Sequence, residues 1–218
     1  MRKLLYVLTI ATFSFAIMSC RQITLVVNGA KKPKIETPDH METFLHSTGC
    51  TEAKTAILKF DALPSAIANG MIPTQVYVFD KAGNGLKLPG ATNKCAPDPS
   101  IFIQNLDPFK QYKMDTSLDL RSMIDFLNTT HNEPFHADSD GSDFYVFVTW
   151  AVWPGKKVFK RDIMSCISAV RKNKNSRICL LLVNVDMQSA WGEDNLKRVE
   201  FTTTSMRVNL KGYTPSSQ

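Results

Sequence analysis

The sequence predicts an α/β protein with a mixed sheet, built around a strand–helix–strand unit at residues 144–188. Phe144 to Trp153 is a nearly unbroken apolar run, rich in β-branched and aromatic residues, which is typical of a strand buried on both faces. Ile178 to Val185 is a second such run. Between them, apolar residues recur at helical spacing: Phe159, Ile163, Cys166, Ile167 and Val170. This order predicts two parallel strands joined by a right-handed crossover.

The N-terminus resembles a bacterial lipoprotein signal. Basic Arg2 and Lys3 precede an apolar segment, Leu4 to Met18, that is too short to span a bilayer, which needs about 20 apolar residues. Ile17-Met18-Ser19-Cys20 then resembles a lipobox. We therefore predict that residues 1–19 are a signal peptide and that Cys20 is lipidated. The alternatives are an ordinary signal peptide with a chance cysteine, and an N-terminal anchor helix.

The lipid on Cys20 would make a membrane the first partner of the chain. A thioether-linked diacyl group together with an acylated amine supplies several chains, which is enough for stable anchoring. Position 21 is Arg rather than Asp, so the usual signal for retention in the inner membrane is missing. We expect a protein of the bacterial cell envelope, lipid-anchored, with the outer membrane favoured.

The charge of the chain is mildly basic. Removal of residues 1–19 takes away Arg2 and Lys3, so the formal net charge falls from +6 to +4. The basic residues are spread along the sequence and form no cluster interleaved with aromatic residues, which argues against nucleic acid as a partner. A basic surface beside an anionic membrane or cell wall is the simpler interpretation.

Residues 28–48 are polar and contain Pro33 and Pro38, which predicts a tether between the lipidated Cys20 and a folded body. The expected organisation is a signal peptide at 1–19, the lipidated cysteine and tether at 20–48, and a single domain at 49–218. His40 and His46 would be exposed linker residues rather than metal ligands.

The first part of the domain is expected to be β-rich. Ala56 to Phe60 is a short strand candidate. Gln75 to Asp80 and Leu86 to Leu88 flank Ala82-Gly83-Asn84-Gly85, and Asn-Gly between two strand-like runs is a strong hairpin signal. A loop at 89–100 follows, and Ile101 to Ile103 are expected to pair briefly with another strand.

A helix and an acidic loop are expected before the central unit. Asp115-Thr116-Ser117 resembles a helix N-cap, and the residues after it place Leu120, Met123, Ile124 and Leu127 on one face. The loop at 129–142 contains His131, His136 and several aspartates. It lacks the full pattern of an EF-hand and has no tetrahedral zinc spacing, so we predict a solvated acidic turn and no metal site.

The turn after the first central strand carries a family resemblance. Trp150-Ala151-Val152-Trp153-Pro154-Gly155-Lys156-Lys157 resembles the active-site turn of thioredoxin-like proteins, especially exported lipoprotein-type reductases, whose pattern is roughly W-A-x-W-C-G-P-C. Val183 to Asp186 resembles their second central strand. Pro154 and Lys157 stand where the two cysteines would be. Dithiol exchange needs a thiolate and a resolving thiol, so it cannot run at this turn.

The family resemblance also implies elements after Asp186. A complete thioredoxin-like domain would add a helix, a cis-proline loop, a hairpin and a final helix, and the remaining residues do not follow that order. Val199 to Leu210 instead forms a β-rich segment. Either the usual C-terminal half is missing, or the preceding β-hairpin region substitutes for it.

Four cysteines remain beside Cys20. In an exported protein this number permits two disulfides, and we predict a Cys50–Cys95 bond because both residues lie in loops around the hairpin. Cys166, on a helix face, and Cys179, at the start of a strand, are expected to be buried thiols. If those two met, they could form a displaced redox pair.

One end of the central unit gathers candidate ligand-binding or partner-binding residues. Polar residues at the C-terminal end of a strand lie where open α/β sheets place ligands, and basic residues in a first helical turn lie where anions bind. Packing, a solvated helix face and bracing of the turn are the alternative roles. The candidates are Trp150, Trp153, Lys156, Lys157, Asn184, Asp186, Gln188 and Trp191.

These observations predict a non-catalytic, thioredoxin-like envelope lipoprotein that acts as a binding or accessory subunit, possessing no cofactor and taking part in an envelope protein complex. The alternative is a thiol-disulfide oxidoreductase that uses relocated cysteines, namely Cys166 and Cys179. The replacement of both motif cysteines by Pro154 and Lys157 favours the first hypothesis.

Overall fold

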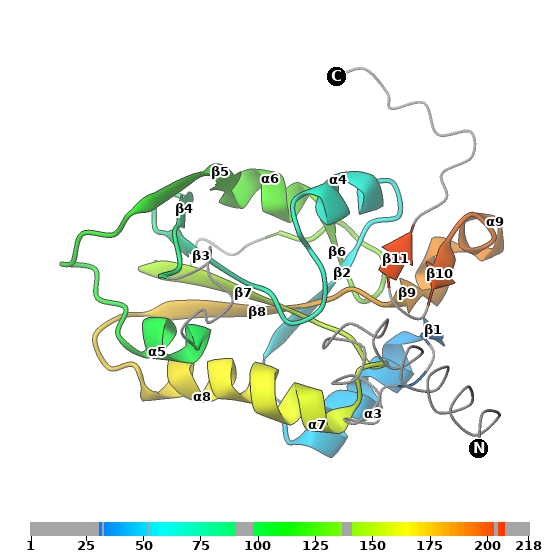
Figure 1. Cartoon of the computed structure of the whole chain (residues 1–218), viewed down its shortest axis with the longest axis horizontal. Coiled ribbons are helices and arrows are strands. Elements are labelled where there is room, and N and C mark those ends of the chain that lie inside the picture. The colour runs from blue at the N-terminus through cyan, green and yellow to red at the C-terminus, as the bar shows by residue number, and fades with distance from the viewer. Residues whose placement is uncertain are drawn as a thin grey trace, which may run out of the picture.

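A seven-stranded mixed sheet forms the centre of the computed structural model, which describes residues 31, 33–51, 53–89, 98–136, 141–202 and 205–207. Its strand order is β5-β4-β3-β7-β8-β2-β6 (Figure 1). β2, β8 and β7 are parallel to one another, and the other neighbours are antiparallel. The strands are β2 (Lys54–Leu58), β3 (Val76–Asp80), β4 (Asn84–Leu86), β5 (Met114–Asp119), β6 (Leu127–Thr129), β7 (Phe144–Trp150) and β8 (Ile178–Asn184).

The predicted strand–helix–strand unit is confirmed, as is the α/β fold class with a mixed sheet. β7 and β8 pair in parallel from Phe144↔Ile178 to Trp150↔Asn184. They are joined by α7 (Lys156–Val158), a π-helical segment η1 (Phe159–Ile163) and α8 (Met164–Lys172). All seven residues of β7 are buried, as its continuous apolar run predicts.

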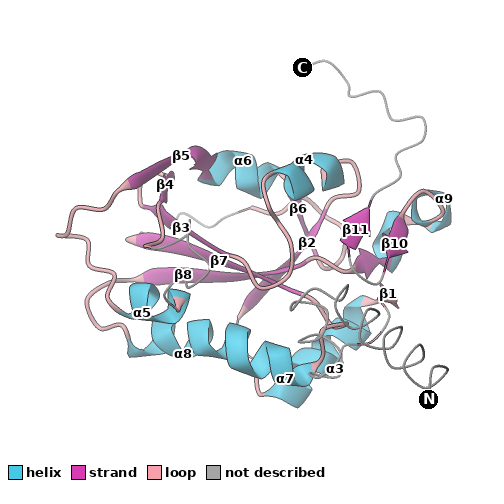
Figure 2. Ribbon diagram, in the orientation of Figure 1, coloured by secondary structure: helices cyan, strands magenta, loops and turns pink. Residues whose placement is uncertain are grey.

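Helices cover both faces of the sheet (Figure 2). One face packs against α3 (Pro38–Thr48), α5 (Pro99–Gln104), η1 and α8, and the other against α4 (Leu63–Ala68) and α6 (Leu120–Asp125). Val146 and Val148 lie in the first core with Phe159, Ile163 and Ile167. Leu181 and Val183 lie in the second core, because in-register parallel pairing places Leu180 and Leu182 on the side of Val146 and Val148.

The predicted hairpin is confirmed, but its turn is formed by residues 81–83 and not by Asn84-Gly85. The Asp80 carboxylate accepts hydrogen bonds from the backbone N–H groups of Ala82 and Asn84, both at 2.9 Å, and Gly83 has the positive φ of +89°. Asn84 and Gly85 belong to β4. A Cβ atom on Gly85 would lie 2.5 Å from the Cβ atom of Leu118 in β5, so this glycine permits close approach of two strands.

The hairpin also decides how the sheet is completed. β3 pairs antiparallel with β7, with Val78 opposite Val146. The strands that extend the sheet on that side of β7, namely β3, β4 and β5, therefore come from before the strand–helix–strand unit and not from after Asp186. Of the two alternatives for the C-terminal half, the structure supports substitution by the N-terminal strands.

The predicted polar tether is wrong for residues 35–48. β1 (Ile35–Glu36) pairs in parallel with β9 (Met187–Gln188), and α3 follows directly. Thr37 caps α3, with its hydroxyl accepting from the His40 N–H at 3.2 Å, and Pro38 occupies the first turn. The helix buries Met41, Phe44 and Leu45, since three apolar residues at i, i+3 and i+4 suffice for one stripe. The folded body thus includes residues before 49.

Two further expectations are corrected. Ile101 to Ile103 lie in α5 and do not pair as a strand. The helix cap expected at Asp115 to Ser117 falls within β5, and α6 begins after Asp119, whose carboxylate accepts from the Ser122 N–H at 2.8 Å. After β9 come a 3-10 turn η2 (Ser189–Trp191), α9 (Glu193–Leu196) and an antiparallel pair, β10 (Glu200–Thr202) and β11 (Ser205–Arg207), in the segment expected to be β-rich.

Candidate functional site at the carboxyl ends of the parallel strands

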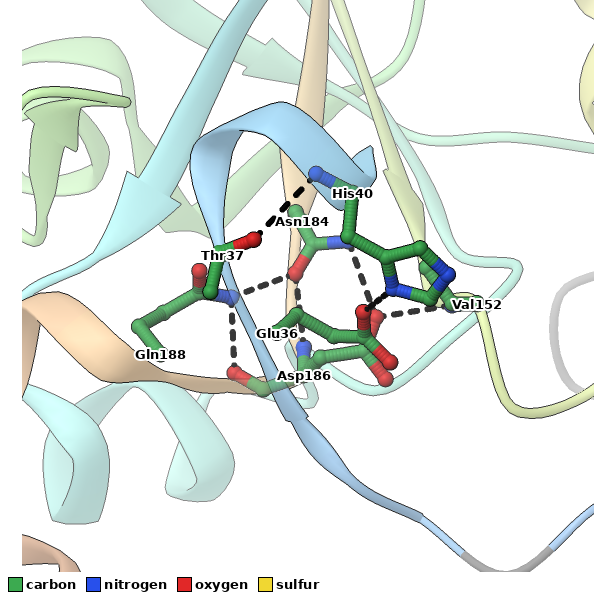
Figure 3. A network of polar contacts seen from close by, with 7 residues as sticks. All are labelled: Glu36, Thr37, His40, Val152, Asn184, Asp186 and Gln188. Carbon is green, nitrogen blue, oxygen red and sulfur yellow. Dashed lines mark hydrogen bonds and ion pairs between the residues drawn. The ribbon is translucent and has the colours of Figure 1, made fainter. Parts of the chain in front are cut away.

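A buried polar network lies where β7 and β8 end (Figure 3). Asn184 ends β8, Asp186 follows it, Gln188 lies in β9 and Glu36 lies in β1. Each of these side chains is 2% exposed or less. Parallel strands bring their carboxyl ends to one edge of the sheet, which is why residues distant in sequence meet here. Asn184, Asp186 and Gln188 were predicted from the sequence, and the structure brings them together.

Hydrogen bonds tie this network to the turn after β7. Oδ2 of Asp186 accepts from the Val152 N–H at 2.7 Å and from Nδ2 of Asn184 at 2.9 Å. Oδ1 of Asn184 in turn accepts from the Asp186 N–H at 2.9 Å and from Nε2 of Gln188 at 2.5 Å. Nε2 of Gln188 also donates to the Asp186 carbonyl at 2.9 Å. The turn at Val152 is therefore held from inside by a buried carboxyl group.

A second buried carboxyl group comes from the N-terminal segment. Glu36 is 2% exposed, and its Oε2 contacts Nδ1 of His40, one turn into α3. The pKa of Asp186 is raised to about 7, chiefly by burial and to a smaller extent by the charge of Glu36, while the hydrogen bonds from Val152 and Asn184 act in the opposite direction. Oδ1 of Asp186 has no hydrogen-bond partner among the described residues. A proton on Asp186 therefore lowers the repulsion between two buried acids.

The other predicted ligand-face residues separate into two groups. Trp150 is fully buried and stacks on Phe44, with ring centroids 5.8 Å apart. Trp191 is also buried, and its Nε1 donates to the Leu58 carbonyl at 2.8 Å. Both tryptophans are core residues, while Lys156 and Lys157 are exposed and Trp153 is half-buried. The predicted face is thus not one continuous surface.

The turn that resembles a thioredoxin-like active site carries no sulfur. Pro154, at the position of the nucleophile, is buried, and Lys157, at the position of the second cysteine, points its charge to solvent as an exposed side chain. Gly155 precedes α7 with φ +88°. The Val152 N–H is already bonded to Asp186, so the backbone donor that opens this turn is satisfied internally.

The relocated-cysteine alternative loses its geometric support. Cys166 lies on the buried face of α8, and burial raises the pKa of its thiol to about 12, which disfavours a thiolate. Cys179, expected to be buried, is half-buried and packs against the core on the opposite face of the sheet. The two thiols therefore do not meet. Cys50 is buried, and Cys95 and Cys20 lie outside the described residues, so the Cys50–Cys95 bond and the lipidation of Cys20 stay predictions.

Two residues of the network, Glu36 and His40, were missed as site residues by the sequence reasoning because they fell in the expected tether. The signal that could have placed them is Thr37-Pro38-Asp39, a capping residue, a proline in the first turn and an acidic residue, which together mark a helix start. No sequence pattern indicates that the glutamate before such a cap is buried.

Among the described residues, no group of three or more histidine, cysteine or acidic side chains is arranged to hold a metal ion. Within the same ranges, no helix is both long and apolar enough to cross a bilayer. No family model, curated protein or solved structure matches the chain.

Proposed function

We propose that the chain is a non-catalytic, thioredoxin-like lipoprotein of the bacterial cell envelope, anchored through Cys20 with the outer membrane favoured, that binds a partner as an accessory or scaffold subunit. One observation carries the non-catalytic part. The turn from Trp150 to Lys157 resembles the active-site turn of thioredoxin-like proteins but contains no cysteine. The buried Asp186 carboxyl group holds this turn by accepting a hydrogen bond from the Val152 N–H.

The chemistry of the replacement residues supports this proposal. Thiol-disulfide exchange proceeds by attack of a thiolate on a disulfide sulfur atom. Pro154 has no nucleophilic side chain, and the ammonium group of Lys157 cannot resolve a mixed disulfide. Cys166 has a raised pKa and is 3% exposed, so it can neither ionise readily nor reach a substrate disulfide.

The closure of the strand ends supports the proposal independently. Ligands of open α/β sheets bind beyond the carboxyl ends of the strands. Here that region is covered by the chain itself, because β1 pairs with β9 and α3 packs Phe44 on Trp150. Glu36, Asn184 and Gln188 hydrogen-bond or pack within the protein and are nearly inaccessible to solvent. This arrangement fits a protein that presents an outer surface to a partner.

An insulin-reduction assay with dithiothreitol tests the non-catalytic part. The full-length protein is expected to show no rate above the uncatalysed background. The double variant Pro154→Cys, Lys157→Cys puts a thiol at both positions of the resembled motif. It is the matched positive control, because insulin reduction by this variant would show that the turn can still support dithiol exchange. Insulin reduction by the unmodified protein that is lost on Cys166→Ala or Cys179→Ala would establish the enzyme alternative.

Affinity capture from native membranes tests the binding part. The full-length protein with a C-terminal tag is expected to retain a stoichiometric envelope protein after mild detergent extraction. The variant Lys156→Glu, Lys157→Glu changes the exposed half of the predicted face and shows whether that half contributes. A wild-type protein recovered alone at native expression level would contradict the scaffold function.

A further inference from the structure

The loop between α5 and β5 exposes a large aromatic side chain. Phe109 is 95% exposed, and Ile101 in α5 and Met114 at the start of β5 are 59% and 48% exposed. Among the described residues, the remaining exposed large apolar side chain is Ile35 in β1, at the opposite end of the molecule (Figure 1). Three exposed apolar side chains therefore lie in the segment from α5 to the start of β5.

Hydrogen bonds hold this loop in a defined shape. Asp107 accepts from the Phe109 N–H through Oδ1 at 3.0 Å and from the Lys110 N–H through its carbonyl at 3.0 Å. The Asp107 N–H donates to the Tyr112 hydroxyl at 2.8 Å, and the Tyr112 ring packs edge-on against Phe144 at the start of β7. The loop is thus braced against the core, and the Phe109 ring is held outward with nothing to cover it.

The same end of the molecule gathers basic side chains from separate parts of the sequence. Lys110 and Lys113 are exposed in the loop, and the Lys87 N–H donates to the Lys113 carbonyl at 2.8 Å. Asn173, just after α8, donates from Nδ2 to the Leu106 carbonyl at 2.9 Å, so the end of α8 lies beside the start of this loop. The basic tip is defined by these side chains with Phe109: Lys87, Lys110, Lys113, Lys172 and Lys174.

The acidic groups near the basic tip are engaged within the protein. The carboxylate of Asp107 accepts from the Phe109 N–H, and that of Asp115 accepts from the N–H and hydroxyl of Ser117. Asp143 lies beside Arg177. Asp107 and Asp115 keep their charge, but the five lysines of the tip outnumber them, so the tip carries an excess of positive charge around Phe109. The sequence showed no such cluster because the contributing residues come from the segment just after β4, from the loop before β5, and from the end of α8 and the residues after it.

We propose that the basic tip docks on the surface of an anionic phospholipid bilayer. Basic residues attract the acidic headgroups, and an exposed aromatic ring enters the boundary between headgroups and acyl chains. A soluble polyanion would engage the lysines but would leave Phe109 in water. The contact does not depend on the lipid at Cys20, because β1, where the described N-terminal segment enters the fold, lies at the other end of the molecule (Figure 1).

Vesicle flotation tests this docking. The full-length protein is first held in phosphatidylcholine nanodiscs, which accommodate its N-terminal segment, and then mixed with vesicles. We expect co-flotation with vesicles that contain phosphatidylglycerol and little with vesicles of phosphatidylcholine alone. Raising the salt from about 0.1 M to about 1 M shortens the screening length from about 10 Å to about 3 Å and should release the protein.

Variants identify the surface responsible. Phe109→Ser should weaken binding at least about tenfold, because an exposed ring that packs on nothing contributes only in the bilayer. Lys110→Glu with Lys113→Glu should weaken it by about fivefold or more for each position. The control is Lys34→Glu with Lys197→Glu, at exposed positions beside β1 and after α9, which makes the same change of charge at the other end of the molecule and should bind as wild type. Equal binding by all variants, equal binding to both lipid compositions, or no binding at all would overturn the inference.

Discussion

Asp186 is the residue whose ionisation has the largest structural consequence among the described residues of the site. Its carboxyl group holds the Val152 turn and lies near the buried Glu36. Glu36 belongs to a strand of two residues, β1, which is joined to β9 by a short parallel pairing. The repulsion between the two acids therefore acts directly on the attachment of the N-terminal segment.

The stability of the protein is expected to depend on pH through Asp186. The unfolded chain releases this proton near pH 3.8, while the folded protein retains it until about pH 7. The stabilisation is complete below the lower value and is lost as pH rises through the upper one. Urea unfolding of the wild type should therefore give a falling free energy of unfolding between about pH 4 and about pH 7.

Asp186→Asn should remove most of that slope. An amide can still accept from the Val152 N–H, and its NH₂ group takes the place of the carboxyl proton beside Glu36. We expect the variant to exceed the wild type in stability above pH 7 by on the order of 2–4 kcal/mol, since each unit of pKa shift corresponds to about 1.4 kcal/mol. Asp115→Asn, at an exposed Asx turn in β5, is the matched control and should keep the wild-type slope. The same slope in both variants would exclude Asp186 as its source.

At the scale of elements, β7 and β8 show what an apolar sequence does and does not encode. The two runs correctly predict parallel strands, which are buried over the whole of β7 and over the second half of β8, because strands buried on both faces are apolar throughout. The same uniformity removes the alternation that would assign a face to each residue. The pairing register decides the face instead, and it places Leu181 and Val183 in the core on the side of the sheet opposite α8.

Turn chemistry likewise predicts a hairpin without fixing its register. Asn84-Gly85 was expected to form the turn, whereas Gly83 supplies the positive φ and Gly85 admits Leu118 of the neighbouring strand. The two glycines are used for different physical reasons, one for backbone conformation and one for space. A glycine needed for close packing depends on a strand distant in sequence, so no local pattern indicates it.

Leu181→Ala measures the second core. Leu181 is 1% exposed in β8 and packs with the side chains between the sheet and helices α4 and α6. The substitution should lower the free energy of unfolding by roughly 2–5 kcal/mol, the range for truncating a large core residue. Thr116→Ala, at an exposed position of β5, should stay within about ±0.5 kcal/mol. Equal, small effects of both changes on urea unfolding would place Leu181 outside the core.

At the scale of the whole molecule, the sequence left open how the sheet is completed beyond β7. Local patterns identified β2, the β3–β4 hairpin and the central unit, but the pairing of β3 with β7 joins segments that no short-range signal connects. The boundary of the folded body was missed for a similar reason. α3 is polar along most of its length, and the partner of its apolar stripe, Trp150, lies far along the chain.

The attachment of the whole protein to the envelope is expected to depend on Cys20. Mass spectrometry of the wild type purified from membranes should find acyl chains on this residue. Cys20→Ala should leave an uncleaved or mislocalised precursor, because signal processing and lipidation both require the thiol. Cys50→Ala, which leaves the lipobox unchanged, is the control. A wild-type protein that is soluble and unmodified at Cys20 would rule out the lipoprotein proposal.

The position of β2 in the sheet constrains the order in which the chain can fold during synthesis. β2 lies between β6 and β8, and both of these partners come later in the chain. β1 likewise pairs with β9, which comes later still. A chain emerging from its N-terminus therefore carries unpaired strand edges and the apolar stripe of α3 until the segment around Asn184 is available. Such long-range pairings slow folding and expose surfaces that associate with other chains. The central pairings of the sheet can therefore form only after the residues up to Asn184 have been made.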